Sequence, residues 1–202
     1  MKSKRKIKKS FWKPDFRESW SYIKESRNFI YAVLFIFLAF LLLGAFIPVP
    51  DVLAQKLMEF IEEILQKTEN MSFLELLGFL FLNNSESSFL GMIFGIFFGI
   101  FSVFTAMSNG YLIGFVSSRV ISSEGILVLW RLFPHGIFEL PAVMISLGLG
   151  LRLGTFIIQK NKLEFLKNNL WKSLRVFLFV ILPLLFIAAI IEAALISFSG
   201  IS

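Results

Sequence analysis

Residues 29–46 read FIYAVLFIFLAFLLLGAF, an apolar run that no charged residue interrupts. At about 1.5 Å per residue, a helix of this length extends about 27 Å, close to the thickness of the hydrocarbon core of a bilayer. The rest of the chain has the same character, since hydrophobic residues make up 56% of its 202 residues and 26 residues are phenylalanine. A soluble domain of this size does not carry apolar residues in such long runs. We therefore predict an all-α, polytopic integral membrane protein with about five hydrophobic helices, some of them broken or re-entrant.

The charged residues predict two regions and an orientation. Residues 1–28 form a basic arm with interleaved aromatic residues, and residues 29–202 form a single membrane domain. A second basic cluster lies between Lys160 and Arg175. Because cytoplasmic loops are enriched in Lys and Arg, we predict a multi-pass protein of the cell membrane with a cytoplasmic N-terminus. The arm suits the surface of the lipid bilayer; RNA binding is the alternative, but we expect no nucleic-acid partner because no RNA-binding fold fits into the arm.

Residues 51–70 predict an external amphipathic helix that begins after Pro50. Its polar face is acidic, so anionic lipid would repel it, and we expect it to pack on this protein or on a partner protein. The apolar face contains Leu53, Leu57, Phe60, Ile61, Ile64 and Leu65, and the polar face contains Gln55, Glu59, Glu62, Glu63 and Gln66.

The next helices are predicted from turn-forming residues and from small residues at regular spacing. A short helix at 73–82 is expected to end at the polar residues 83–85, and a longer one at 89–116 is expected to break at Asn109-Gly110. Two sets of small residues recur every four positions, a spacing that lets helix backbones approach closely in lipid. Each set is expected to pack against the other, or against a second copy in a homodimer. The sets are Gly91, Gly95, Gly99 and Ser146, Gly150, Gly154.

The segment 134–142, PHGIFELPA, contains the only histidine of the chain, His135, with Glu139 four residues later. Ionisable side chains in an apolar region are costly there, so they usually face a protein interior and have a function. Two topologies fit residues 110–151. In one, 111–133 crosses the membrane fully; in the other, 126–133 enters halfway, 134–136 turns and 137–151 returns. The re-entrant form is favoured because it keeps Arg119 out of the membrane centre.

Two more ionisable residues lie in apolar segments, Arg152 and Glu192. We expect Arg152 to pair with Glu139 or Glu192, and His135 to bond a carboxylate, so that the group pins one helix against another. An ion or proton relay in a channel or transporter is the alternative, although no internal repeat is visible. An enzyme is least favoured, because one His and no Cys leave a zinc site incomplete. We expect no enzymatic activity, no cofactor and no metal.

Four pieces of the chain together resemble the stage II sporulation protein M family. They are Asn109-Gly110 with Gly114; the segment PHGIFELPA with Pro134, Gly136 and Pro141; Gly148, Gly150 and Gly154 around Arg152; and Ile190-Ile191-Glu192-Ala193. PHGIFELPA is the specific element, and the other three are useful only in this order. The resemblance implies a membrane scaffold or assembly factor, as its members in spore-forming bacteria tether peptidoglycan-degrading proteins. We therefore expect membrane or envelope protein partners.

Overall fold

A computed structural model describes residues 16–47, 50–125 and 133–199. Residues 1–15 of the basic arm lie outside these ranges. So do residues 126–132, which would enter the membrane in the re-entrant topology. Within the described ranges the regular structure is helical, without a strand. The prediction of an all-α polytopic membrane protein is therefore confirmed.

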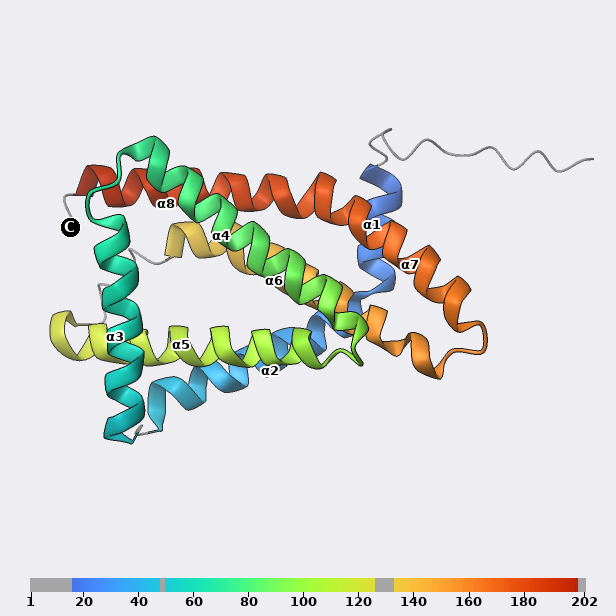
Figure 1. The fold of residues 1–202 in the computed structure, drawn as a ribbon, viewed down its shortest axis with the longest axis horizontal. Helices are drawn as coiled ribbons and strands as arrows, with labels where there is room; N and C mark the ends of the chain where they lie inside the picture. Colours follow the sequence, from blue (N-terminus) through green and yellow to red (C-terminus); the bar gives the residue numbers. More distant parts are fainter. Residues whose placement is uncertain (1–15, 48–49, 126–132, 200–202) are drawn as a thin grey trace, which may run out of the picture.

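Five long helical segments run between the two ends of the molecule, and α4 and α6 are inclined to α5 and α8 (Figure 1). Four of them, α2, α5, α6 and continuous α7–α8, are long and apolar enough to cross a membrane. Helix α4 has a similar length and runs among them, although it carries polar residues at its middle. The segments are α2 (Arg27–Phe46), α4 (Phe73–Ile93), α5 (Ile100–Glu124), α6 (Phe133–Gly154), α7 (Lys162–Val176) and α8 (Leu182–Ser199).

Two amphipathic helices lie across the ends of this bundle (Figure 1). Helix α1 (Phe16–Glu25) lies at the end where α2 begins and α6 finishes, and we call this the clamp end. Helix α3 (Asp51–Thr68) lies at the opposite end, where α2 and α5 finish and α4 and α6 begin, and we call this the open end. A membrane around the bundle therefore has one amphipathic helix near each surface.

Helix α6 is the centre of the packing, because it contacts α2, α4, α5 and α8. Its residues Leu147, Leu149 and Leu153 are fully buried. Fully buried Val33 of α2 and Leu185 of α8 meet it from two sides. The ionisable residues of α6 consequently have positions fixed by a well-packed helix.

The chain bends at places other than those expected. Helices α4 and α5 continue without interruption through 83–85 and through Asn109-Gly110, so both expected breaks are wrong. The Asn109 side chain donates a hydrogen bond of 3.0 Å to the Thr105 carbonyl, which satisfies it inside a helix. The turn lies instead at Phe98 and Gly99, whose φ angles of 59° and 75° are left-handed.

Helices α7 and α8 join through a π-helical segment at Phe177–Ile181. Pro183 lies two residues after this segment, and proline has no N–H to donate to the carbonyl four residues earlier, that of Phe179. A wider turn of helix accommodates this missing bond without ending the helix.

Candidate functional site

The segment PHGIFELPA forms the first turns of α6, at the open end. Pro134 lies in the first turn, where a helix needs no N–H from it. The chain therefore makes no turn at 134–136, and α6 runs unbroken to Gly154. Residues 111–133 do not form one continuous helix either, because α5 ends at Glu124. Residues 126–132, which both topologies place in the membrane, lie outside the described part of the chain. The turn was wrongly expected because proline and glycine were taken as a break, although the first turn of a helix accepts both.

Glu139 of α6 and Glu192 of α8 lie close enough to interact electrostatically, and both are partly buried. Within the described part of the chain, neither carboxylate has a hydrogen bond or an ion pair to another side chain. The backbone of His135 lies one helical turn before Glu139, so the two residues share a face of α6. The side chain of His135, and with it the expected bond to a carboxylate, lies outside the described part.

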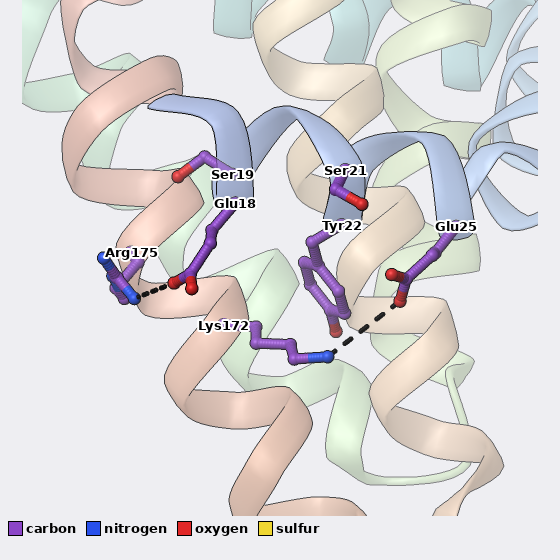
Figure 2. A pocket seen from close by; sticks show the side chains of 7 residues that line it. All are labelled: Glu18, Ser19, Ser21, Tyr22, Glu25, Lys172 and Arg175. Atoms are coloured by element: carbon purple, nitrogen blue, oxygen red, sulfur yellow. Dashed lines mark hydrogen bonds and ion pairs between the residues drawn. The ribbon is translucent and has the colours of Figure 1, made fainter. Parts of the chain in front are cut away.

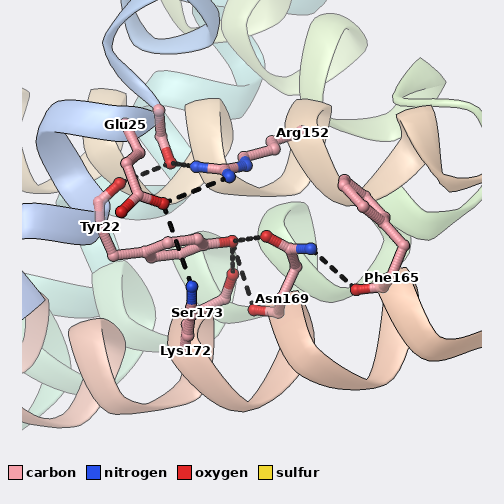
Figure 3. Close-up of polar contacts among 8 residues, drawn as sticks. Tyr22, Glu25, Arg152, Phe165, Asn169, Lys172 and Ser173 are labelled. Carbon is pink, nitrogen blue, oxygen red and sulfur yellow. Dashed lines mark hydrogen bonds and ion pairs between the residues drawn. The ribbon is translucent and has the colours of Figure 1, made fainter. Parts of the chain in front are cut away.

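Arg152 lies at the other end of α6, so the expected pair with Glu139 or Glu192 is not formed. It lies thirteen positions after Glu139, which is about 20 Å along a helix. Arg152 instead donates a hydrogen bond of 2.7 Å to the Ser26 hydroxyl and lies 3.6 Å from a carboxylate oxygen of Glu25 (Figure 3). A guanidinium at a helix end reaches partners near the membrane surface at lower cost than partners inside it.

Tyr22 of α1 is the central residue of the clamp end (Figure 3). Its hydroxyl is buried and lies 3.1 Å from Oδ1 of Asn169 and 3.2 Å from Oγ of Ser173, both on α7. The guanidinium of Arg152 lies 4.5 Å from the centre of the Tyr22 ring, within reach of a cation–π interaction. Burial raises the pKa of the Tyr22 phenol above its usual value. The neutral phenol therefore joins α1, α6 and α7.

Ion pairs at the clamp end surround a small pocket between α1 and α7 (Figure 2). Arg175 donates a hydrogen bond of 2.8 Å to Glu18, and Lys172 lies 3.9 Å from Glu25. The pocket volume is about 220 Å³. Each cation that lines it faces a carboxylate, so the arrangement is suited to holding α1 against α7.

We did not predict this clamp from the sequence, because we assigned the residues of α1 to a basic arm on the surface of the bilayer. A signal was present, since Glu18, Tyr22 and Glu25 follow one another at spacings of four and three. That spacing places them on one face of a helix. A polar face that includes a tyrosine and lies next to a membrane span suggests a helix that packs back onto the bundle.

The small residues of 91–99 and 146–154 face one another where α4 and its following turn cross α6. A Cβ atom built on Gly150 would lie 2.8 Å from the Gly91 carbonyl oxygen, and one on Gly154 would lie 2.6 Å from that of Gly95. Ser146 donates a hydrogen bond of 2.8 Å to the Ser88 carbonyl. We call this contact the α4–α6 seam. The chain itself covers these glycines, so a homodimer has to use another surface.

A second close contact joins α2 to α5, and we call it the α2–α5 seam. A Cβ atom on Gly110 would overlap the Phe37 carbonyl oxygen, and one on Gly114 would overlap that of Leu41. Gly44 meets the Tyr111 carbonyl from the other side. The absence of a side chain at Gly110 therefore allows the backbones of α2 and α5 to approach closely.

The motif residues of early α6 differ from these glycines. Among the described residues, a Cβ atom on Gly136 would have only the end of the Leu140 side chain nearby, at 3.8 Å. Pro141 is exposed on the surface of α6. Packing against the described residues therefore does not require a glycine at position 136.

A family model described as stage II sporulation protein M matches residues 33–195. Comparisons with curated proteins and with solved structures found no match. Among the described residues, no three His, Cys, Asp or Glu side chains are grouped to hold a metal ion.

Proposed function

Since the chain belongs to the stage II sporulation protein M family, we propose that it is a multi-pass scaffold or assembly factor that positions partner proteins at the cell envelope. One observation carries the proposal: helix α3 lies across the open end, and the other described residues leave most of its surface uncovered. A scaffold needs such a surface, because recruitment depends on contacts that remain available after folding.

The exposed surface of α3 has both an apolar and an acidic component. Ala54 is the one buried residue among those α3 side chains that the structure describes, whereas Val52 is 68% exposed and Phe60 48%. Glu59 and Glu62 are exposed nearby. An apolar centre beside charged residues is typical of protein interfaces. The matching partner surface has an apolar pocket with basic residues around it.

The charges at the two ends support an orientation with α3 outside the cell. The described clamp end is rich in Lys and Arg, and the first residues of the chain are also basic. The open end carries α3 with its excess of acidic residues. Under the positive-inside tendency, the clamp end is cytoplasmic and partners meet α3 on the outer face.

Partner capture from native membranes tests this function. We expect Phe60→Ser to remove envelope proteins that co-purify with the wild-type protein. Leu163→Ser is the matched control, because Leu163 is 80% exposed on α7 at the clamp end. Glu59→Lys with Glu62→Lys tests the acidic component, and Glu164→Lys on α7 is its control. If Phe60→Ser and the double change Glu59→Lys with Glu62→Lys both retain the same partners as the wild type and the controls, α3 does not recruit them and the proposal fails.

Transport is the second candidate, and the Glu139–Glu192 pair favours it. Two carboxylates close together inside a membrane bundle are the kind of group that carries protons or cations. Ion flux into proteoliposomes that contain the pure protein tests this function. Flux that Glu139→Gln or Glu192→Gln reduces would support transport, and absence of flux for a panel of ions and solutes would exclude it for that panel.

A further inference from the structure

Helix α4 carries exposed polar residues at its middle, where a membrane protein meets hydrocarbon. Asn83, Glu86 and Ser87 are exposed, and Asn83 is the central residue of this 21-residue helix. Helix α4 is not one of the four candidate spans, but it runs between the two ends of the bundle alongside α6 and α8, so a bilayer that surrounds those spans also surrounds its middle. An amide or a carboxylate that faces lipid hydrocarbon is costly, which implies that another group covers it.

The exposed face of α4 also has the spacing of a helix contact. Asn83, Ser87, Leu90 and Phe94 follow one another at intervals of four, three and four, and all four are exposed. This is the repeat by which one helix packs along another. Buried Ser88 and Met92 lie on the opposite side of α4 and pack on the chain's own bundle. Leu76, seven residues before Asn83 on the same face, is buried, so the exposed face is confined to the second half of the helix. We call the exposed set Asn83, Ser87 and Leu90 the α4 stripe.

We propose that the α4 stripe is a dimer interface, in which it packs against the α4 stripe of a second copy of this chain. Two copies in one membrane have the same orientation, so a two-fold axis along the membrane normal makes the two α4 helices parallel. Asn83 and Ser87 then each meet their own counterpart at the same depth.

The chemistry of Asn83 and Ser87 fits pairing with themselves, and Glu86 lies about 60° around the helix from Asn83, outside the line of contact. An amide both donates and accepts hydrogen bonds, and so does a hydroxyl. Within the described part of the chain, the Asn83 amide makes one side-chain hydrogen bond, to Oδ1 of Asn84 at the long distance of 3.5 Å. Its carbonyl oxygen and second N–H are therefore available to a partner amide. A single asparagine in a helix-pairing seam is an effective way to fix the register of a dimer.

A second copy fits the α4 stripe better than an unrelated membrane helix does. Any other partner must carry a polar group at the depth of Asn83, whereas a second copy carries one by symmetry. The two glycine seams are not available for this contact, because α6 covers one and α2 covers the other. The interface is independent of the partner that α3 is proposed to bind.

Cysteine crosslinking in native membranes tests the dimer, since the chain contains no cysteine of its own. We expect Asn83→Cys, Ser87→Cys and Leu90→Cys to form disulfide-linked dimers on mild oxidation. Asn83→Cys and Ser87→Cys each remove a residue that is proposed to pair across the interface. Leu90→Cys keeps both of these residues, so it reports on the intact interface. The control is Leu38→Cys, in the middle of α2 and 46% exposed. Crosslinking at the three stripe positions no greater than at Leu38→Cys would overturn the proposal.

Energy transfer between labelled copies in proteoliposomes gives a second measurement. We expect Asn83→Leu to raise the dimer dissociation constant about threefold to twentyfold, the range for one interhelical hydrogen bond in a membrane. Leu82→Ala is the control at a neighbouring position, and we expect no change from it. Chemical labelling measures whether water reaches the α4 stripe. If Asn83→Cys reacts with a membrane-impermeant maleimide, the α4 stripe lines a water-filled space and the proposal fails. The dimer and the proposed function are tested separately. Changes on α3 test partner recruitment and should leave the dimer intact. Changes in the α4 stripe test the dimer and should leave the partners of α3 bound.

Discussion

The two ends of the bundle satisfy their polar groups in opposite ways. At the clamp end, Tyr22, Arg152 and Arg175 each have a partner outside their own helix at hydrogen-bond distance. At the open end, Glu139 and Glu192 lie close enough to interact electrostatically, and α3 leaves acidic and apolar residues exposed. The charges of the clamp end are therefore paired within a single chain, whereas these carboxylates of the open end have no ion pair to another side chain among the described residues. This difference suggests that the clamp end provides stability and the open end provides function.

Tyr22→Ala should have the largest effect, because it removes a fully packed ring from the centre of the clamp. Truncating a buried aromatic side chain typically costs about 3–5 kcal/mol. Trp20→Ala is the control on the same helix, since Trp20 is 57% exposed. Unfolding in mixed detergent and SDS measures both. Equal losses for the two variants would show that the clamp contributes little beyond general contact with the membrane.

Gly114→Ala tests whether the bundle is as tight near the open end as at the clamp end. The added methyl group would overlap the Leu41 carbonyl oxygen, and we expect a loss of about 1–3 kcal/mol. Gly78→Ala is the matched control, because nothing lies within 4 Å of a Cβ atom there. We expect that change to be neutral or slightly stabilising, since alanine favours a helix. If Gly114→Ala is also neutral, the helices at the open end are loosely packed as well as exposed.

Arg152→Met should destabilise the clamp end by about 1.5–3 kcal/mol, the usual contribution of a hydrogen bond to a charged group. Its side chain is 15% exposed, so water cannot replace the lost partner easily. Lys172→Met changes the other cation near Glu25. The Lys172 side chain is 53% exposed, and its Nζ lies 3.9 Å from a carboxylate oxygen of Glu25. We expect at most about 1 kcal/mol from that change. Similar losses in an SDS unfolding titration would contradict a special role for Arg152.

Tyr22→Phe should have a smaller effect at neutral pH, about 1 kcal/mol for the lost hydroxyl contacts. Because burial raises the pKa of Tyr22 in the folded state, the neutral phenol stabilises the fold below the unfolded-state pKa of about 10. That contribution is lost as the pH rises through the higher folded-state pKa. We therefore expect wild-type stability to fall more steeply above about pH 10 than that of Tyr22→Phe. Parallel pH curves would show that the phenol does not contribute in this way.

Changes on α3 should have the smallest effect on stability. We expect Val52→Ser with Phe60→Ser to alter the unfolding midpoint by less than about 0.5 kcal/mol, because both side chains are exposed. The same double change should abolish partner capture. A large loss of stability would mean that α3 packs on the bundle and is not available to partners.

Local patterns in the sequence predicted the parts of the fold that depend on neighbouring residues. The amphipathic spacing predicted a helix at 51–70, and the structure has one at Asp51–Thr68. The positions where helices end were predicted poorly. Gly110 and Pro134 both favour turns when considered alone. In the structure, Gly110 lies inside a helix where it allows close packing on α2, and Pro134 lies in the first turn of α6. The local sequence does not distinguish these uses.

The sequence by itself determined that this is an all-α membrane protein, because long apolar runs are stable only as helices in lipid. It also identified Glu139, Arg152 and Glu192 as unusual, because charge is rare among such residues. Only the tertiary structure decided which of them meet. Ser26 and Arg152 are 126 positions apart, and Tyr22 and Ser173 are 151 apart. Such pairs form only when particular helices become neighbours, and that arrangement depends on how all the helix surfaces fit together.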